Sequence, residues 1–165
     1  MVGYWKDDEV NGFATIYKPD GSKLYEGNIK DKKYNGEGTF YVKSGGKIVG
    51  YWKDSKVNGY ATFYNPDGSK LYEGNLKNSE YNGYGTFYYT NGSKYEGNFK
   101  DDKYYGYGTF YWANGDKYEG YYKDGTRNGQ GNLYYVNGNK YEGSFKDGLF
   151  FNGTLYDING KTVEN

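Results

Sequence analysis

Polar and apolar residues alternate along most of this chain. In the stretch Tyr-Glu-Gly-Asn-Phe-Lys at 95–100, the rings and the glycine fall on one side of an extended chain, and the polar residues fall on the other. A period of two is typical of a half-buried strand, whereas an amphipathic helix has a period of 3.6. The pattern predicts one strand over 95–100, a second over 107–112, and a connection over 101–106. The residues at 114–116, Asn-Gly-Asp, are expected to turn the chain into the next hairpin, because these residues tolerate positive φ.

The same pattern recurs along the whole chain. The glycine of the Tyr-Glu-Gly triplet, or its equivalent, returns every 23 or 24 residues. A fixed period in this range indicates stacked units that bury apolar surface against their neighbours. We therefore predict an all-β fold, an elongated, curved and twisted antiparallel meander of consecutive β-hairpins, because large open sheets twist or coil. The marker glycines are Gly3, Gly27, Gly50, Gly74, Gly97, Gly120 and Gly143.

The repeats divide the chain into seven units of one array. The seventh unit has lost the first glycine of its Gly-x-Gly pair, and we expect it to be a cap-like variant, since terminal repeats are commonly atypical. The pattern begins almost at the first residue, so we expect the chain to be a fragment of a longer protein. The predicted units are approximately 1–24, 25–47, 48–71, 72–94, 95–117, 118–140 and 141–165.

Aligned units place large apolar residues in columns on one face. Small residues share that face, and a glycine beside a ring leaves room for the ring to lie flat over the backbone. The small column after the marker reads Ala14, Gly38, Ala61, Gly85, Gly108, Gly131 and Gly153, and the column two residues before the marker reads Met1, Tyr25, Ile48, Tyr72, Tyr95, Tyr118 and Tyr141.

The opposite face carries columns of glutamate, lysine and tyrosine. Cross-strand pairs of these residues stabilise a sheet by a few tenths of a kcal/mol to about 1 kcal/mol each, so the columns have a structural explanation. The tyrosine column consists of Tyr17, Tyr41, Tyr64, Tyr88, Tyr111, Tyr134 and Tyr156.

These columns resemble the MORN repeat (membrane occupation and recognition nexus). The shared motif is Tyr-Glu-Gly, then Asn-Phe-Lys, Gly-x-Gly-x-Phe and a turn glycine, and the match covers essentially residues 2–160. The resemblance implies a curved antiparallel sheet with a groove. It also implies a scaffold that binds proteins or, in some members, is associated with membranes. Function transfers less firmly than fold, because one repeat serves many partners.

Composition argues against catalysis. The chain has no His and no Cys, so the usual general base, metal ligand and thiol nucleophile are missing together. The aspartates at 7, 31, 54, 101, 124 and 147 share one repeat position, which favours a role in turns over a site. We therefore expect no enzyme, no catalytic or metal-binding residues and no cofactor. With 21 basic and 21 acidic residues, no net field attracts nucleic acid, and we expect no nucleic-acid partner.

Binding is the better hypothesis, with a helix or an extended peptide of a protein partner held in an aromatic groove. Peripheral association with a phospholipid surface is the first alternative, which zero net charge disfavours. Binding of glycans by an extracellular aromatic surface is the second. Val49 and Tyr51 replace polar residues of other units, a further aromatic run follows the second strand in three units, and Arg127 is the only arginine. The candidate partner-binding residues are Tyr41, Tyr64, Tyr88, Tyr111, Tyr134, Tyr89, Trp112, Tyr135, Val49 and Tyr51.

The ends of the array and its compartment complete the expectations. A sheet that ends on an unpaired strand can join end to end with a second copy, so self-association is a further possible interaction. This chain shows no signal peptide and no transmembrane segment. The compartment is left open, with the cytoplasm favoured.

Overall fold

The computed structural model describes residues 2–6 and 9–163, with side chains from residue 11 onward. This part of the chain forms fourteen strands and no helix. The odd-numbered strands are β1 (Val2–Lys6), β3 (Lys23–Lys30), β5 (Lys47–Lys53), β7 (Lys70–Lys77), β9 (Lys94–Lys100), β11 (Lys117–Lys123) and β13 (Lys140–Lys146). The even-numbered strands are β2 (Glu9–Tyr17), β4 (Lys33–Tyr41), β6 (Lys56–Tyr64), β8 (Glu80–Tyr88), β10 (Lys103–Tyr111), β12 (Thr126–Tyr134) and β14 (Leu149–Tyr156).

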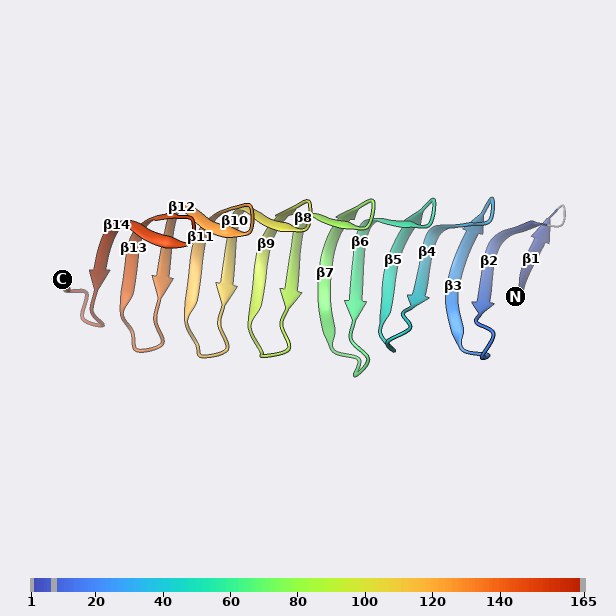
Figure 1. Cartoon of the computed structure of the whole chain (residues 1–165), viewed down its shortest axis with the longest axis horizontal. Coiled ribbons are helices and arrows are strands. Elements are labelled where there is room, and N and C mark those ends of the chain that lie inside the picture. Colours follow the sequence, from blue (N-terminus) through green and yellow to red (C-terminus); the bar gives the residue numbers. More distant parts are fainter. Residues whose placement is uncertain (1, 7–8, 164–165) are drawn as a thin grey trace. The chain divides into compact units, whose positions relative to one another are not determined.

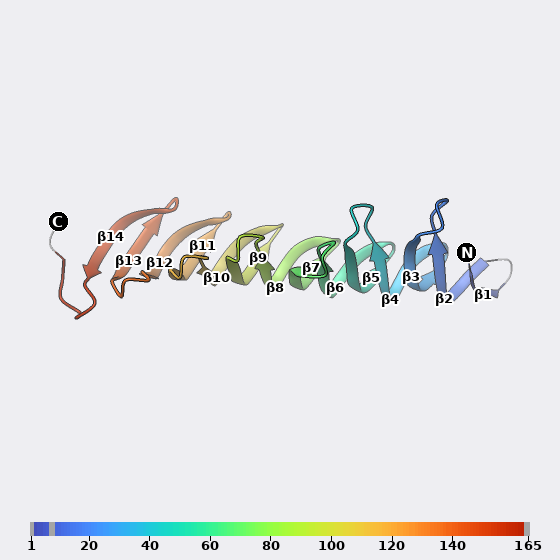
Figure 2. The ribbon, with the colours of Figure 1, turned by 90° about the horizontal axis from the view of Figure 1, so that it is seen from below.

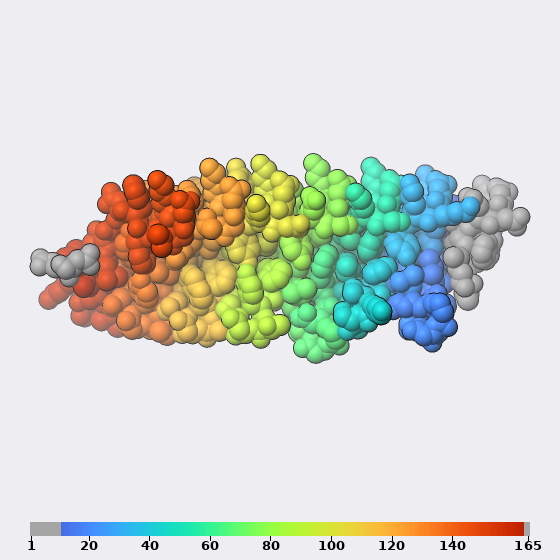
Figure 3. Space-filling view, in the orientation of Figure 1, coloured from blue at the N-terminus to red at the C-terminus, as the bar shows by residue number. Residues whose placement is uncertain are grey.

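The chain divides into two compact units, residues 1–81 and 82–165. Within the first unit, β1 to β7 pair antiparallel in the order of the sequence. Within the second, β8 to β14 do the same (Figure 1). In the space-filling view, the hairpins of each unit occupy successive bands of the surface (Figure 3). The predicted all-β antiparallel meander of hairpins is therefore confirmed.

The turns inside the hairpins are shorter than the sequence suggested. Only Asp101 and Asp102 connect β9 to β10, with φ of 50° and 65°, and Lys100 pairs directly with Lys103. The prediction of a connection over 101–106 is thus wrong, because two residues with positive φ suffice for a turn whose twist matches that of the strands. The aspartates at 31, 54, 101, 124 and 147 all have positive φ, which confirms their role in turns, and Asp7 lies outside the described residues.

Gly125 provides a test of this turn geometry. It follows Asp124 in the turn before β12, has a φ of +88°, and a Cβ added to it would meet no atom within 4 Å. Gly125→Ala should therefore cost about 1 kcal/mol through backbone conformation alone. Gly125→Asn should cost less, because Asn tolerates this region. Urea denaturation of the two variants measures both values, and a loss as large for Asn as for Ala would contradict the explanation.

Five even-numbered strands, β2, β4, β6, β10 and β12, contain a large bulge near their start. In β10, Tyr104 pairs with Phe99 and Gly108 pairs with Gly97, so three residues of β10 lie opposite Asn98 alone. Gly106, inside this bulge, has a φ of +68°, which explains why a glycine recurs there. Figure 2 shows the strands of each unit curving along their length. Such a bulge bends the strand that contains it. Aromatic rings pack together on one face of the bent strands.

That face, here called the packed face, is built on tyrosines that lie over glycines. Tyr95 is fully buried, and its hydroxyl donates a hydrogen bond to the Asn98 carbonyl oxygen at 3.0 Å. A Cβ on Gly108 would lie 2.4 Å from that hydroxyl oxygen, so only glycine fits under the ring. Tyr104 stacks on Tyr95 with ring centroids 3.7 Å apart. Tyr25 and Tyr118 repeat the arrangement, which confirms that the small column makes room for rings.

The seventh repeat closes with a smaller bulge. Between β13 and β14, Ser144 pairs with Asn152 and Phe145 pairs with Phe150, so only one extra residue is present. The ring centroids of Phe150 and Phe145 lie 5.4 Å apart, and Leu149, Phe150 and Phe151 are all exposed. The lost glycine therefore changes the strand that ends the sheet. End-to-end association through this strand stays a prediction.

Candidate binding groove

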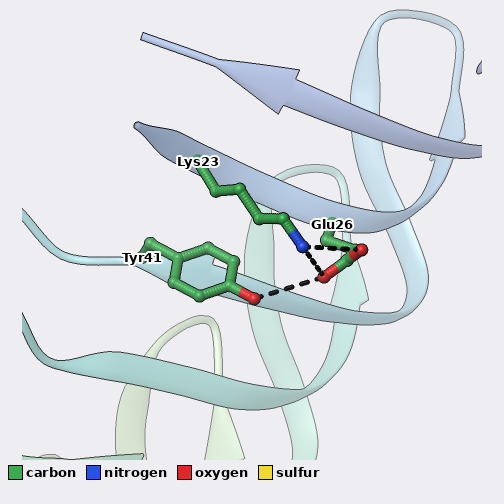
Figure 4. Close-up of polar contacts among 3 residues, drawn as sticks. All are labelled: Lys23, Glu26 and Tyr41. Carbon is green, nitrogen blue, oxygen red and sulfur yellow. Dashed lines mark hydrogen bonds and ion pairs between the residues drawn. The ribbon is translucent and has the colours of Figure 1, made fainter. Parts of the chain in front are cut away.

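The opposite face, here called the polar face, carries repeated groups of lysine, glutamate and tyrosine. Lys23 Nζ lies 3.0 and 2.9 Å from the two carboxylate oxygens of Glu26, and the Tyr41 hydroxyl donates a hydrogen bond to Glu26 at 3.2 Å (Figure 4). The same ammonium lies 5.9 Å from the centroid of the Tyr41 ring. The hydrogen bond between Lys23 and Glu26 raises the pKa of the lysine and lowers the pKa of the glutamate.

The second unit repeats this arrangement. Lys94 contacts Glu96 at 2.6 Å and lies 4.5 Å from the centroid of Tyr111. Lys117 contacts Glu119 at 2.7 Å and lies 4.4 Å from the centroid of Tyr134. A partner that contacts the ring of one of these tyrosines would therefore also meet a lysine ammonium. Among the predicted binding residues, Tyr41, Tyr64, Tyr88, Tyr111 and Tyr134 are all half-buried.

The third repeat departs from the pattern. Lys47 lies 5.0 Å from the centroid of Tyr64, but Val49 stands where the second and the fourth to seventh repeats have a glutamate. Val49 and the neighbouring Tyr51 are both exposed. This substitution replaces a charged position with an apolar one on the polar face.

Val49 and Tyr51 lie in a groove of about 820 Å³ on the polar face of the first unit. Its large side chains are unusually exposed for their type, with 52% of Phe13, 51% of Tyr51 and 58% of Tyr60 accessible to solvent. No lysine or arginine lines the groove among the described residues. The lining residues are Phe13, Glu26, Gly27, Asn28, Glu37, Gly38, Thr39, Val49, Gly50, Tyr51, Tyr60 and Thr62.

Strand register explains why these side chains meet. Phe13 pairs with Asn28, Glu37 with Tyr51, and Tyr60 with Asn75, so these residues form one row across the strands. We call this set the exposed row. The sequence interpretation missed Phe13 and Tyr60, although period two already places the residue between the two small residues of the Gly-x-Gly motif on the polar face. The alternation thus marked this position, but its residue changes from repeat to repeat, as Phe13, Glu37 and Tyr60 show.

The second unit has a smaller depression on its own polar face. It measures about 400 Å³, and Tyr107 and Tyr121 line it with ring centroids 5.5 Å apart at 82°. Tyr107 pairs directly with Tyr121 across β10 and β11, at positions equivalent to the exposed row. Aromatic residues on the polar face are therefore a feature of both units.

The remaining predicted residues lie on the packed face. Tyr89 contacts the rings of Phe87 and Phe110 at 5.0 and 5.6 Å, and its hydroxyl meets that of Tyr104. The ring centroids of Trp112 and Phe110 lie 4.7 Å apart. Tyr135 is partly buried, and this burial raises its pKa. Tyr89 and Trp112 thus extend the ring packing on the face opposite to Tyr111 and Tyr134, and 38% of Tyr89 is still accessible to solvent.

Arg127 also belongs to the packed face. It takes the place that Tyr104 has in the preceding repeat, and its guanidinium carbon lies 5.0 Å from the centroid of Phe145 and 5.5 Å from that of Tyr118. One Nη donates a hydrogen bond to the Gly148 carbonyl oxygen at 2.7 Å. The planar cation therefore replaces a stacked ring.

Comparison with protein families bears directly on this array. The model of the MORN repeat matches residues 2–23, 25–47, 49–70, 72–94, 95–117, 118–140 and 141–150. The chain belongs to the MORN-repeat family. A search of curated proteins found no significant match.

MORN arrays are repeat scaffolds, generally non-catalytic, and typically interact with proteins or membrane lipids. Within the described residues, no helix is long and apolar enough to cross a membrane. The described part of the chain also holds no group of three or more acidic side chains suited to a metal ion.

Proposed function

We propose that this MORN array is a non-catalytic scaffold that binds a helix or an extended segment of a protein partner in the groove of its first unit. The observation that carries the proposal is the exposure of Phe13, Val49, Tyr51 and Tyr60 together in one groove. Exposed rings of this size typically supply most of the binding energy of an interface. The amide and hydroxyl groups beside them can hydrogen-bond to the backbone of a partner.

A phospholipid surface fits the groove less well. Anionic lipids attract lysine and arginine, and the charged residues that line this groove are Glu26 and Glu37. Vesicles and peptides can therefore be compared as ligands in one experiment. Glycan binding draws on the same exposed rings, but the acidic side chains favour a partner that carries positive charge.

Selection of peptides tests the proposal without a known partner. The whole chain is used as bait for a phage-displayed library of random 12-residue peptides, and synthetic versions of enriched peptides are measured by fluorescence anisotropy. Tyr51→Ser/Tyr60→Ser should weaken binding by about 30-fold, because two buried rings at the centre of an interface contribute about 2 kcal/mol or more. Tyr105→Ser is the matched control, since Tyr105 is exposed but lies outside the groove.

Three outcomes would overturn the proposal. The library could yield no enriched peptide, or the enriched peptides could bind the double variant as tightly as the wild type. The lipid alternative would be favoured if the selection yielded no peptide that depends on Tyr51 and Tyr60 and the protein floated with phosphatidylserine vesicles. Retention of circular dichroism in each variant shows that the sheet is intact.

A further inference from the structure

Glu37 is the carboxylate at the centre of the exposed row. Glu37 lies between Gly36 and Gly38 and is exposed. It pairs across the strands with Tyr51. Its backbone carbonyl accepts a hydrogen bond from the Asn28 side chain, but its carboxylate makes no hydrogen bond or ion pair within the described residues. Glu26, the other carboxylate of the groove, is already paired with Lys23. Glu37 is thus the acidic group left for a ligand.

The chain itself shows what such a carboxylate and tyrosine bind. At Glu26 and Tyr41, at Glu96 and Tyr111, and at Glu119 and Tyr134, a lysine ammonium contacts the carboxylate and lies within 5.9 Å of the ring centroid. In these cases the lysine comes from the same strand as the glutamate. At Glu37 and Tyr51 the neighbouring carboxylate and ring are present, but no lysine or arginine lines the groove.

We propose that the groove selects a segment in which a lysine or arginine stands next to an apolar side chain. The cation lies between the Glu37 carboxylate and the ring of Tyr51, and the apolar side chain packs against Phe13, Val49 and Tyr60. A carboxylate and an aromatic face attract one cation together, and charge complementarity of this kind fixes orientation as well as partner choice. This inference rests on the proposed function, since it names the chemistry of the partner in the same groove.

The selected peptides test the inference through a double-mutant cycle. Peptides that depend on Tyr51 and Tyr60 should be enriched in Lys or Arg beside an apolar residue. Glu37→Gln should weaken such a peptide by about 5-fold, the range of an ion pair at a partly exposed site. The same substitution should leave the affinity of a peptide with Met in place of the basic residue unchanged. Glu80→Gln is the matched control, because Glu80 is an exposed glutamate at the start of β8 and does not line the groove.

The two proposals fail in different ways. Peptides that require Tyr51 and Tyr60 but carry no excess of Lys or Arg, or that bind Glu37→Gln as well as the wild type, would overturn this inference and leave the groove function standing. Absence of any groove-dependent peptide would overturn both. Weaker binding at 500 mM than at 50 mM salt for the basic peptide, and not for its Met analogue, would support the inference, because salt screens an exposed ion pair.

Discussion

Gly108→Ala is expected to lower the free energy of unfolding by about 3–4 kcal/mol, the cost of displacing a large core side chain. The added methyl group would lie 2.4 Å from the hydroxyl oxygen of Tyr95, which is fully buried. The ring must leave its place, and it then loses its hydrogen bond to Asn98 and its stacking on Tyr104. Urea denaturation followed by circular dichroism measures the change.

The array contains the combination that should restore this loss. In the third repeat, Ile48 replaces the tyrosine and Ala61 replaces the glycine, and Ala61 is buried there. Tyr95→Ile/Gly108→Ala copies that pair into the fifth repeat, so we expect the double variant to recover at least half of the loss. A double variant less stable than Gly108→Ala alone would show that the ring and the methyl group do not compete for one space.

The second large effect is unfolding at alkaline pH. Burial raises the pKa of Tyr25 and of Tyr118 to about 12, and it raises the pKa of Tyr95, Tyr104 and Tyr122 as well. In the unfolded chain a tyrosine ionises near pH 10. Above that pH the unfolded chain releases protons that the folded protein retains, so stability is complete below about pH 10 and falls as pH rises. Unfolding should coincide with tyrosinate absorbance at 295 nm.

Tyr25→Phe separates this effect from the titration of surface lysines. Phenylalanine keeps the ring but loses both the ionisable group and the hydrogen bond to Asn28. The variant should therefore be somewhat less stable at pH 7, yet its stability should fall less steeply with pH between about pH 10 and pH 12. Equal slopes for the variant and the wild type would contradict the assignment.

The sequence was informative where one constraint recurs in every repeat. The alternation at 95–100 predicted the strand, and the glycine column predicted the room under Tyr95 and its equivalents. The predicted length of the turns was wrong, and the error has a physical cause. Residues 105–107 form a bulge opposite the single residue Asn98, and this bulge breaks the alternation with a period of two, so the segment resembled a loop.

The binding surface was harder to predict. Val49 and Tyr51 were recognised because they replace residues that other repeats share. Phe13 and Tyr60 belong to a column without a consensus, and their meeting with Tyr51 depends on the register across separate strands. Tyr89 and Trp112 suggested a binding surface, but both rings pack against Phe110 of β10, which places them on the packed face.

Photocrosslinking tests most directly whether the polar face of the first unit is the binding surface. p-Benzoylphenylalanine is placed at Tyr60 in the groove or at Tyr105 outside it, and each protein is irradiated with a selected peptide. Mass spectrometry should find the peptide attached at position 60 and not at position 105. Attachment at 105 with none at 60 would contradict the proposed function.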